Sequence, residues 1–160
     1  MPSLQKSFLR ISRQQNEFAD TFSRDLLSQY PQLTPFFTGV DMEKHKRDLI
    51  AFLGELASSF DQGVQPEKRF HDLGLLHAEL QIPPRDYPAF GSTLLATLAQ
   101  FDPQWSEELK EAWASAIQEC VRLMISRYPS GSLPQAGRVF IGQGMLARKK
   151  VGRNPGTSDF

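Results

Sequence analysis

Two of the three histidines in the 160-residue sequence fall at spacings that favour a buried site. His45 precedes Leu49 by four residues and His77 follows Leu73 by four, so each histidine shares a helical face with apolar neighbours. A neutral imidazole inside an apolar core needs a partner for its ring nitrogens. A metal is one such partner, because imidazole is the commonest metal ligand, and a backbone carbonyl is another. The spacing alone leaves both interpretations open.

The remaining residues do not favour a metal held by protein side chains alone. Cys120 is the single cysteine, and no further ligand accompanies His45 and His77 at the spacing of a zinc site. A metal that brings its own four equatorial ligands fits two histidines better. Other chemical motifs are weak: the glycines of 142–144 follow no predicted strand, and no Gly-x-Ser-x-Gly segment is found.

The elements that must position these histidines are predicted to be helices. Leucine outnumbers valine and isoleucine together, which favours helix over strand. Apolar residues recur at helical spacing as far as Tyr128. One predicted helix covers about 41–60 and contains His45, and the next covers about 66–80 and contains His77. The apolar face predicted for the second of these helices consists of Phe70, Leu73, Leu76 and Leu80.

Particular residues predict where these helices begin and end. Asp41 is expected to cap the helix that contains His45, because its carboxylate can accept from free backbone N–H groups. Pro83 and Pro84 are expected to stop the helix that contains His77. Asp102 and Pro103 predict the start of the last helix, with aspartate as the cap and proline at the first helical position. Further helical patterns occupy 4–11, 18–26, a short turn at 33–37, and 87–101.

Residues 129–160 differ in composition from the rest of the chain. They hold six of the eleven glycines, three prolines, and five basic residues against one acid. This composition predicts a flexible basic tail after a domain of residues 1–128, with one short ordered piece near 139–141. The balanced net charge gives no indication of nucleic acid binding. We expect no membrane span, no signal peptide and a cytoplasmic location.

The stretch from about Leu4 to Tyr128 resembles the globin family, specifically the bacterial single-domain globins related to flavohaemoglobin. This resemblance implies an all-α globin fold, a three-on-three helical sandwich. Any one of its motifs is weak, but their order and nearly ungapped spacing make the set specific. The motifs are Phe22-Ser-Arg-Asp-Leu-Leu-Ser-Gln-Tyr-Pro31, then Phe37, then the segment 45–54, then Leu73-Gly-Leu-Leu-His77 with Ile82, then 87–95, and finally 105–113.

The resemblance also implies a haem b site. Nε2 of His77 would ligate the iron, and His45 would lie on the opposite side, where it donates a hydrogen bond to bound dioxygen or ligates the iron itself. Arg47 and Arg85 are candidates for pairing with the haem propionates, and His71 is assigned no role. The other residues implied to form the pocket are Phe37, Leu49, Ile82 and Phe90, with Tyr87 supporting the proximal histidine.

The implied function is reversible binding of dioxygen, nitric oxide or carbon monoxide for storage, delivery or sensing. Two alternatives stay open: a nitric oxide dioxygenase or peroxidase-like enzyme that uses a separate reductase, and a haem-free signalling module. Three departures argue against a self-sufficient nitric oxide dioxygenase. Ser23 stands where such relatives carry a tyrosine, Tyr128 stands where they carry a glutamate, and residues 129–160 are too few for a flavin domain. A homodimer is a further hypothesis.

Overall fold

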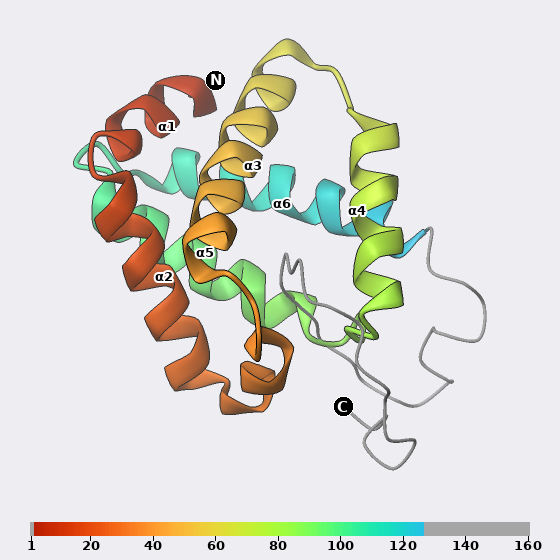
Figure 1. Ribbon diagram of the computed structural model, residues 1–160. Helices are drawn as coiled ribbons and strands as arrows, with labels where there is room; N and C mark the ends of the chain where they lie inside the picture. The colour runs from red at the N-terminus through yellow and green to blue at the C-terminus, as the bar shows by residue number, and fades with distance from the viewer. Residues whose placement is uncertain (1, 127–160) are drawn as a thin grey trace.

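The computed structural model describes residues 2–126, and every regular element within this range is a helix, as predicted. The expectations for Tyr128 and for residues 129–160 lie outside the described residues. In chain order (Figure 1) the elements are α1 (Leu4–Ser12), α2 (Gln15–Gln29), the 3-10 helix η1 (Pro31–Phe37), α3 (Met42–Gln62), α4 (Glu67–Glu79), α5 (Tyr87–Phe101) and α6 (Glu107–Ile125).

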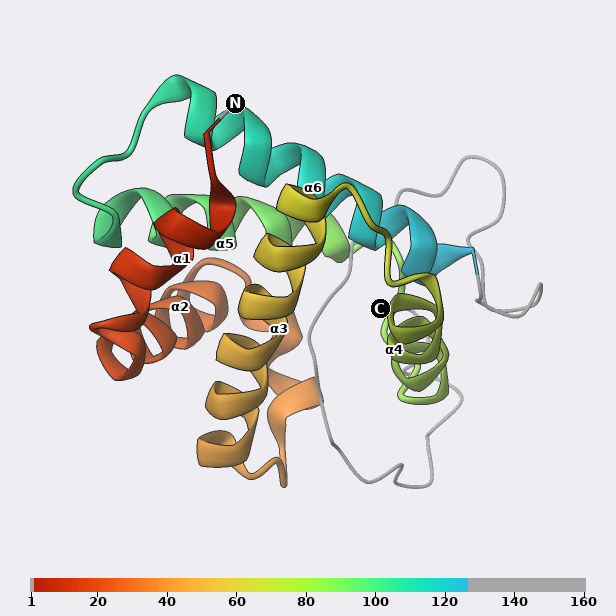
Figure 2. The ribbon, with the colours of Figure 1, turned by 90° about the horizontal axis from the view of Figure 1, so that it is seen from above.

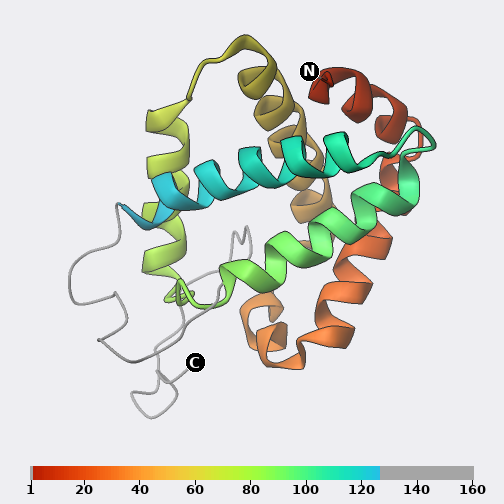
Figure 3. The same cartoon turned by 180° about the vertical axis from the view of Figure 1, so that it is seen from behind.

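The helices form the predicted three-on-three sandwich. Helix α1 packs on α3, α2 packs on α5, and α6 packs on both α4 and α5. Viewed from above, α5 and α6 run along one side of the molecule, with α3 and α4 on the other (Figure 2). Seen from behind, the C-terminal end of α6 crosses α4 (Figure 3). The two predicted histidine helices, α3 and α4, therefore both pack on α6.

Helix α3 has the boundaries that its end residues dictate. Asp41 caps it, and its side chain accepts a hydrogen bond from the backbone N–H of Lys44 at 3.1 Å, which confirms the predicted cap. The helix ends at Gln62, two residues later than predicted, and is capped by Gly63, whose φ of 67° is the left-handed conformation that glycine tolerates best. The N–H of Val64 then donates to the carbonyl of Ser59, closing the last turn.

Helix α4 ends at Glu79, two residues after His77, in a turn that fixes the backbone of that histidine. Gln81 takes a φ of 63°, and its N–H donates to the carbonyl of Ala78. The N–H of Ile82 donates to the carbonyl of His77 at 3.0 Å, and together these two bonds make a Schellman motif. The following prolines, Pro83 and Pro84, prevent continuation of the helix as predicted. The local sequence thus places His77 in the last, anchored turn of α4.

The predicted apolar face of α4 is wrong at one position. Leu76 is 39% exposed, and the buried residues of the helix are instead Phe70, Gly74 and His77. The reason is close packing against α6: a Cβ added at Gly74 would lie 2.7 Å from the Cα of Met124. Because only glycine permits this approach, the side of α4 that contains Gly74 faces inward.

The predicted start of the last helix is also wrong. Helix α6 begins at Glu107 with Ser106 as its cap, whereas Asp102 ends α5. The Asp102 carboxylate accepts hydrogen bonds from Arg10 at 2.6 Å and from Ser7 at 2.6 Å. These bonds, with the Arg10 guanidinium nearby, hold the pKa of Asp102 below its usual range although burial opposes them. The carboxylate fastens α1 to the turn between α5 and α6.

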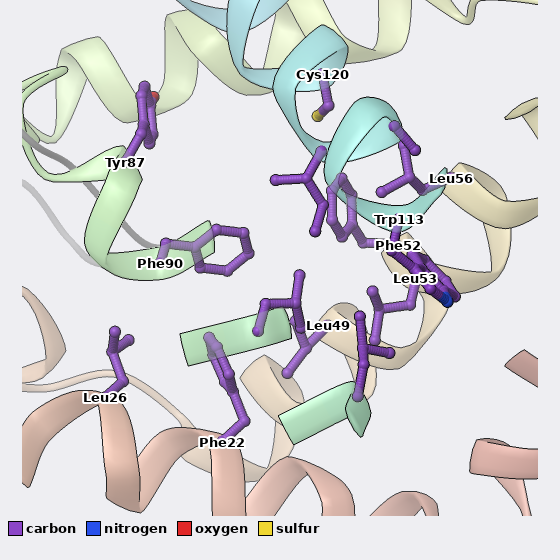
Figure 4. Packing of buried hydrophobic residues seen from close by; sticks show 14 of the residues in the cluster. Phe22, Leu26, Leu49, Phe52, Leu53, Leu56, Tyr87, Phe90, Trp113 and Cys120 are labelled. Carbon is purple, nitrogen blue, oxygen red and sulfur yellow. The ribbon is translucent and has the colours of Figure 1, made fainter. Parts of the chain in front are cut away.

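The core is one cluster to which most helices contribute (Figure 4). Two edge-to-face ring pairs join α2 to α5: Phe18 with Phe101 at 5.5 Å and Phe22 with Phe90 at 5.4 Å between ring centroids. The labelled side chains of Figure 4 converge from α2, α3, α5 and α6. Within residues 2–126, no helix is both long enough and apolar enough to span a bilayer.

Candidate functional site

All seven residues predicted to form the haem site are buried. His77 is 1% exposed near the end of α4, and His45 is 4% exposed in the first turn of α3. The remaining five come from the end of η1, the middle of α3, the turn after α4 and the start of α5, and each is at most 9% exposed: Phe37, Leu49, Ile82, Tyr87 and Phe90.

The two ring nitrogens of His77 have different surroundings. Nδ1 lies 3.1 Å from the phenol oxygen of Tyr87, within hydrogen-bond distance. Nε2 is buried and has no hydrogen-bond partner among residues 2–126. Two effects lower the pKa of His77 to about 3: burial, which is the larger, and the charge of the nearby His45. The imidazole is therefore neutral at physiological pH and leaves one nitrogen lone pair available for a ligand.

His45 is a second neutral imidazole in the interior. Its Nδ1 is likewise buried without a partner in the described part of the chain. Burial lowers the pKa of His45 to about 4; the charge of Asp48 opposes this shift, and the charges of Lys44 and Lys46 add to it. The ring of Phe37 meets the imidazole edge to face, with 5.2 Å between centroids.

A small pocket of about 10 Å³ lies against His77. Tyr87 and Phe90 of α5 line it beside the histidine, so this cavity brings together three of the predicted site residues. Phe52 contributes to its wall from α3, the helix that contains His45. The remaining residues of the lining are Leu73 from α4 and Ile117, Cys120, Val121 and Met124 from α6.

Sequence reasoning did not assign the α6 wall of this pocket to the site. Cys120 is 2% exposed, its thiol lies 3.7 Å from the sulfur of Met124, and burial raises its pKa, so the thiol stays protonated. The spacing of Ile117, Cys120 and Met124 marks an inward helical face, but it carries no signal that this face meets the helix of His77. That contact depends on the three-dimensional crossing of α4 and α6.

Two further hydroxyl groups are buried without a hydrogen-bond partner in the described region, those of Ser23 on α2 and Thr93 on α5. The resemblance aligns Ser23 with a tyrosine of related nitric oxide dioxygenases. Ser23 is 8% exposed and belongs to the inward face of α2. Unsatisfied polar groups of this kind are uncommon in protein interiors. Together with the two histidines, they make up the described buried side-chain atoms that lack a partner.

The two arginines proposed to pair with haem propionates lie closer to the protein surface than the buried histidines do. Arg47 is exposed on α3, and Arg85 is half-buried in the turn before α5. His71 is half-buried on α4, and no predicted role falls on it. The pairing of either arginine with a haem propionate stays a prediction.

Comparison with known proteins identifies relatives of this arrangement. The family model described as Globin matches residues 20–124, which include both histidines. A solved structure from Pseudomonas aeruginosa PAO1, described as structurally highly homologous to a human hemoglobin, is similar with a TM-score of 0.72 and 25% identity. The alignment covers 80% of this chain and 97% of that one. A search of curated proteins gave no match.

Proposed function

The chain belongs to the globin family, and on this premise we propose that it binds haem b through Nε2 of His77 and holds small diatomic ligands reversibly. When bound, haem supplies an iron centre for dioxygen, nitric oxide or carbon monoxide. The observation that carries the proposal is the unpartnered Nε2 of a histidine that is 1% exposed. A buried nitrogen with a free lone pair is costly in a folded core unless a ligand completes it.

Tyr87 supports this role by orienting the imidazole of His77. Coordination through Nε2 requires the proton on Nδ1, and that N–H then donates to the Tyr87 oxygen, 3.1 Å away. Tyr87 is itself held at the first residue of α5 and is 2% exposed. In the ligated state this hydrogen bond would hold the plane of the His77 ring.

We assign His45 as the polar group that faces a bound ligand; it lies outside the lining of the pocket against His77. Its ring packs against Phe37, and Leu49 lies one turn further along the same face of α3. A neutral imidazole can donate one N–H to a polar diatomic ligand. The low pKa of His45 keeps it neutral, so that the pocket remains uncharged.

The test is haem reconstitution followed by optical spectra of the reduced protein with and without carbon monoxide. We expect a strong Soret band that shifts when carbon monoxide is added. His77→Ala should abolish stoichiometric haem uptake, whereas His71→Ala, a histidine on the same helix but outside the pocket, should leave it unchanged. A colourless wild-type protein would refute the proposal and favour a haem-free role.

A further inference from the structure

A surface groove lies beside the pocket that contains His77. It is formed by the end of α3, the 63–66 connection, the start of α4 and the middle of α6, and it encloses about 940 Å³ of empty space including its open mouth. Polar side chains such as Glu119 stand at the groove, but most of its wall is apolar. The apolar residues of the groove are Leu56, Phe60, Val64, Pro66, Phe70, Ala116 and Leu123.

Aromatic rings separate this groove from the pocket. Phe70 lines the groove and Phe52 lines the pocket, and their ring centroids are 6.0 Å apart with the planes tilted by 56°. Helix α6 borders both cavities, with Ala116 and Leu123 in the groove and Cys120 in the pocket. Between Phe70 and Phe52, the partition is made of aromatic side chains.

A route from the groove past Phe70 and Phe52 would end on the face of α3 that contains His45. Phe52 follows His45 by seven residues, or about two helical turns, and both side chains are buried on the inward face of the helix together with Leu49. A molecule that passes Phe52 thus arrives in the pocket against His77, about two helical turns along α3 from His45.

We propose that the groove is an entry port through which small uncharged diatomic ligands reach the interior. This inference rests on the proposed haem site at His77. Such ligands give up little hydration on entering an apolar passage, and a ring that swings aside needs no break in the backbone. By contrast, the surface near His45 carries the ion pair of Lys44 with Asp48 at 2.7 Å, and the His45 ring is packed against Phe37.

The experiment measures carbon monoxide association after flash photolysis in the haem-loaded full chain. Ser59→Trp places an indole in the groove from a half-buried position on α3, and the Ser59 carbonyl that accepts from Val64 is unaffected by the change of side chain. Ser58→Trp is the matched control, because Ser58 is also half-buried on α3 but does not line the groove.

We expect Ser59→Trp to slow association at least about threefold and Ser58→Trp to leave the rate unchanged. Equal rates in the wild type and both variants, with the Soret band retained, would overturn the entry port while leaving the haem proposal intact. A wild-type chain that takes up no haem would overturn the haem proposal and, with it, the port.

Xenon provides a readout that does not depend on ligand binding at the haem, because it enters apolar cavities without polar contacts. Under xenon pressure, NMR resonances of Phe70, Leu56 and Phe52 should shift, and Ser59→Trp should suppress these shifts. Shifts confined to residues outside the groove and the pocket would contradict the port.

Discussion

His77 and His45 share one property that sets them apart from the other titratable groups of the described chain. Each is an imidazole with a strongly lowered pKa, and each has one buried ring nitrogen without a partner in residues 2–126. The two rings are close enough for the charge on His45 to affect the pKa of His77. Neutral imidazoles that face a common interior from two helices suit a cofactor placed between them.

The hydrogen-bond donor that we assign to His45 leads to a kinetic prediction. His45→Ala should accelerate dissociation of dioxygen by about ten- to a hundredfold, because a hydrogen bond to a polarised group is worth on the order of 1.5–3 kcal/mol. Stopped-flow displacement of dioxygen by carbon monoxide measures this rate. An unchanged dissociation rate would mean that the imidazole does not reach the ligand.

Tyr87 is the orienting partner of His77, and its hydroxyl can be removed without changing the ring. Tyr87→Phe should weaken haem affinity by about tenfold or more, the usual effect of losing the hydrogen bond behind a metal-binding histidine. It should also lower the iron–histidine stretching frequency of the ferrous protein, because the imidazole becomes less basic. Resonance Raman spectra and haem transfer to an apoglobin acceptor would measure both. If neither changed, the contact of 3.1 Å would have no role in ligation.

At the level of helices, the position of His77 depends on the crossing of α4 over α6. Gly74 lies one turn before His77, and the backbone of Met124 occupies the space that a side chain would need. The turn after α4 then holds the carbonyl of His77 through Ile82. The histidine is thus constrained from one side by helix packing and from the other by the helix end.

A matched pair of glycine variants tests this constraint. Gly74→Ala should destabilise the fold by about 1–3 kcal/mol or more, because α4 must move away from α6. Gly91→Ala is the control: its added Cβ would meet Ile117 at 3.5 Å, an ordinary contact, and alanine favours a helix by up to about 1 kcal/mol. Urea unfolding measures both. Equal effects would show that α4 and α6 do not approach closely at Gly74.

Asp86, just before α5, gives the element-scale prediction for pH. Its side chain makes no capping hydrogen bond, and burial raises its pKa to about 7 although the charge of Arg85 opposes the shift. The folded state therefore retains a proton that the unfolded state releases near pH 3.8, so this contribution to stability is lost as the pH rises through 7.

Asp86→Asn cannot ionise and should be more stable than the wild type at pH 8, by about 1–3 kcal/mol. The advantage should shrink as the pH falls and should be mostly lost at pH 4, where the unfolded state also begins to bind the proton. Urea unfolding of the two proteins at both pH values measures the difference. A difference that does not vary with pH would contradict the buried carboxyl.

For the molecule as a whole, local signals in the sequence predicted most of the helices and several of their ends. The four-residue spacings around His45 and His77 were sufficient to predict their burial, and Asp41 was sufficient to predict the start of α3. Long-range contacts were not visible in the same way. Asp102 was misassigned as a cap because its partners, Ser7 and Arg10, lie more than ninety residues earlier in the chain.

The candidate site shows the same division. The helices that contain its histidines could be predicted from periodicity, whereas the wall of Cys120 and Met124 could not, since it depends on how α6 crosses α4. Leu76 was assigned to the inward face for a related reason, because no local pattern reveals that Gly74 is the contact point.

The most direct test of the account is chemical rescue of a cavity at position 77. His77→Gly removes the imidazole, and free imidazole added to the solution can occupy the space. We predict that the variant binds little haem alone and that imidazole restores both haem uptake and the carbon monoxide-sensitive Soret band. A His77→Gly protein that kept the wild-type spectrum without imidazole would contradict the assignment of His77 as the haem ligand.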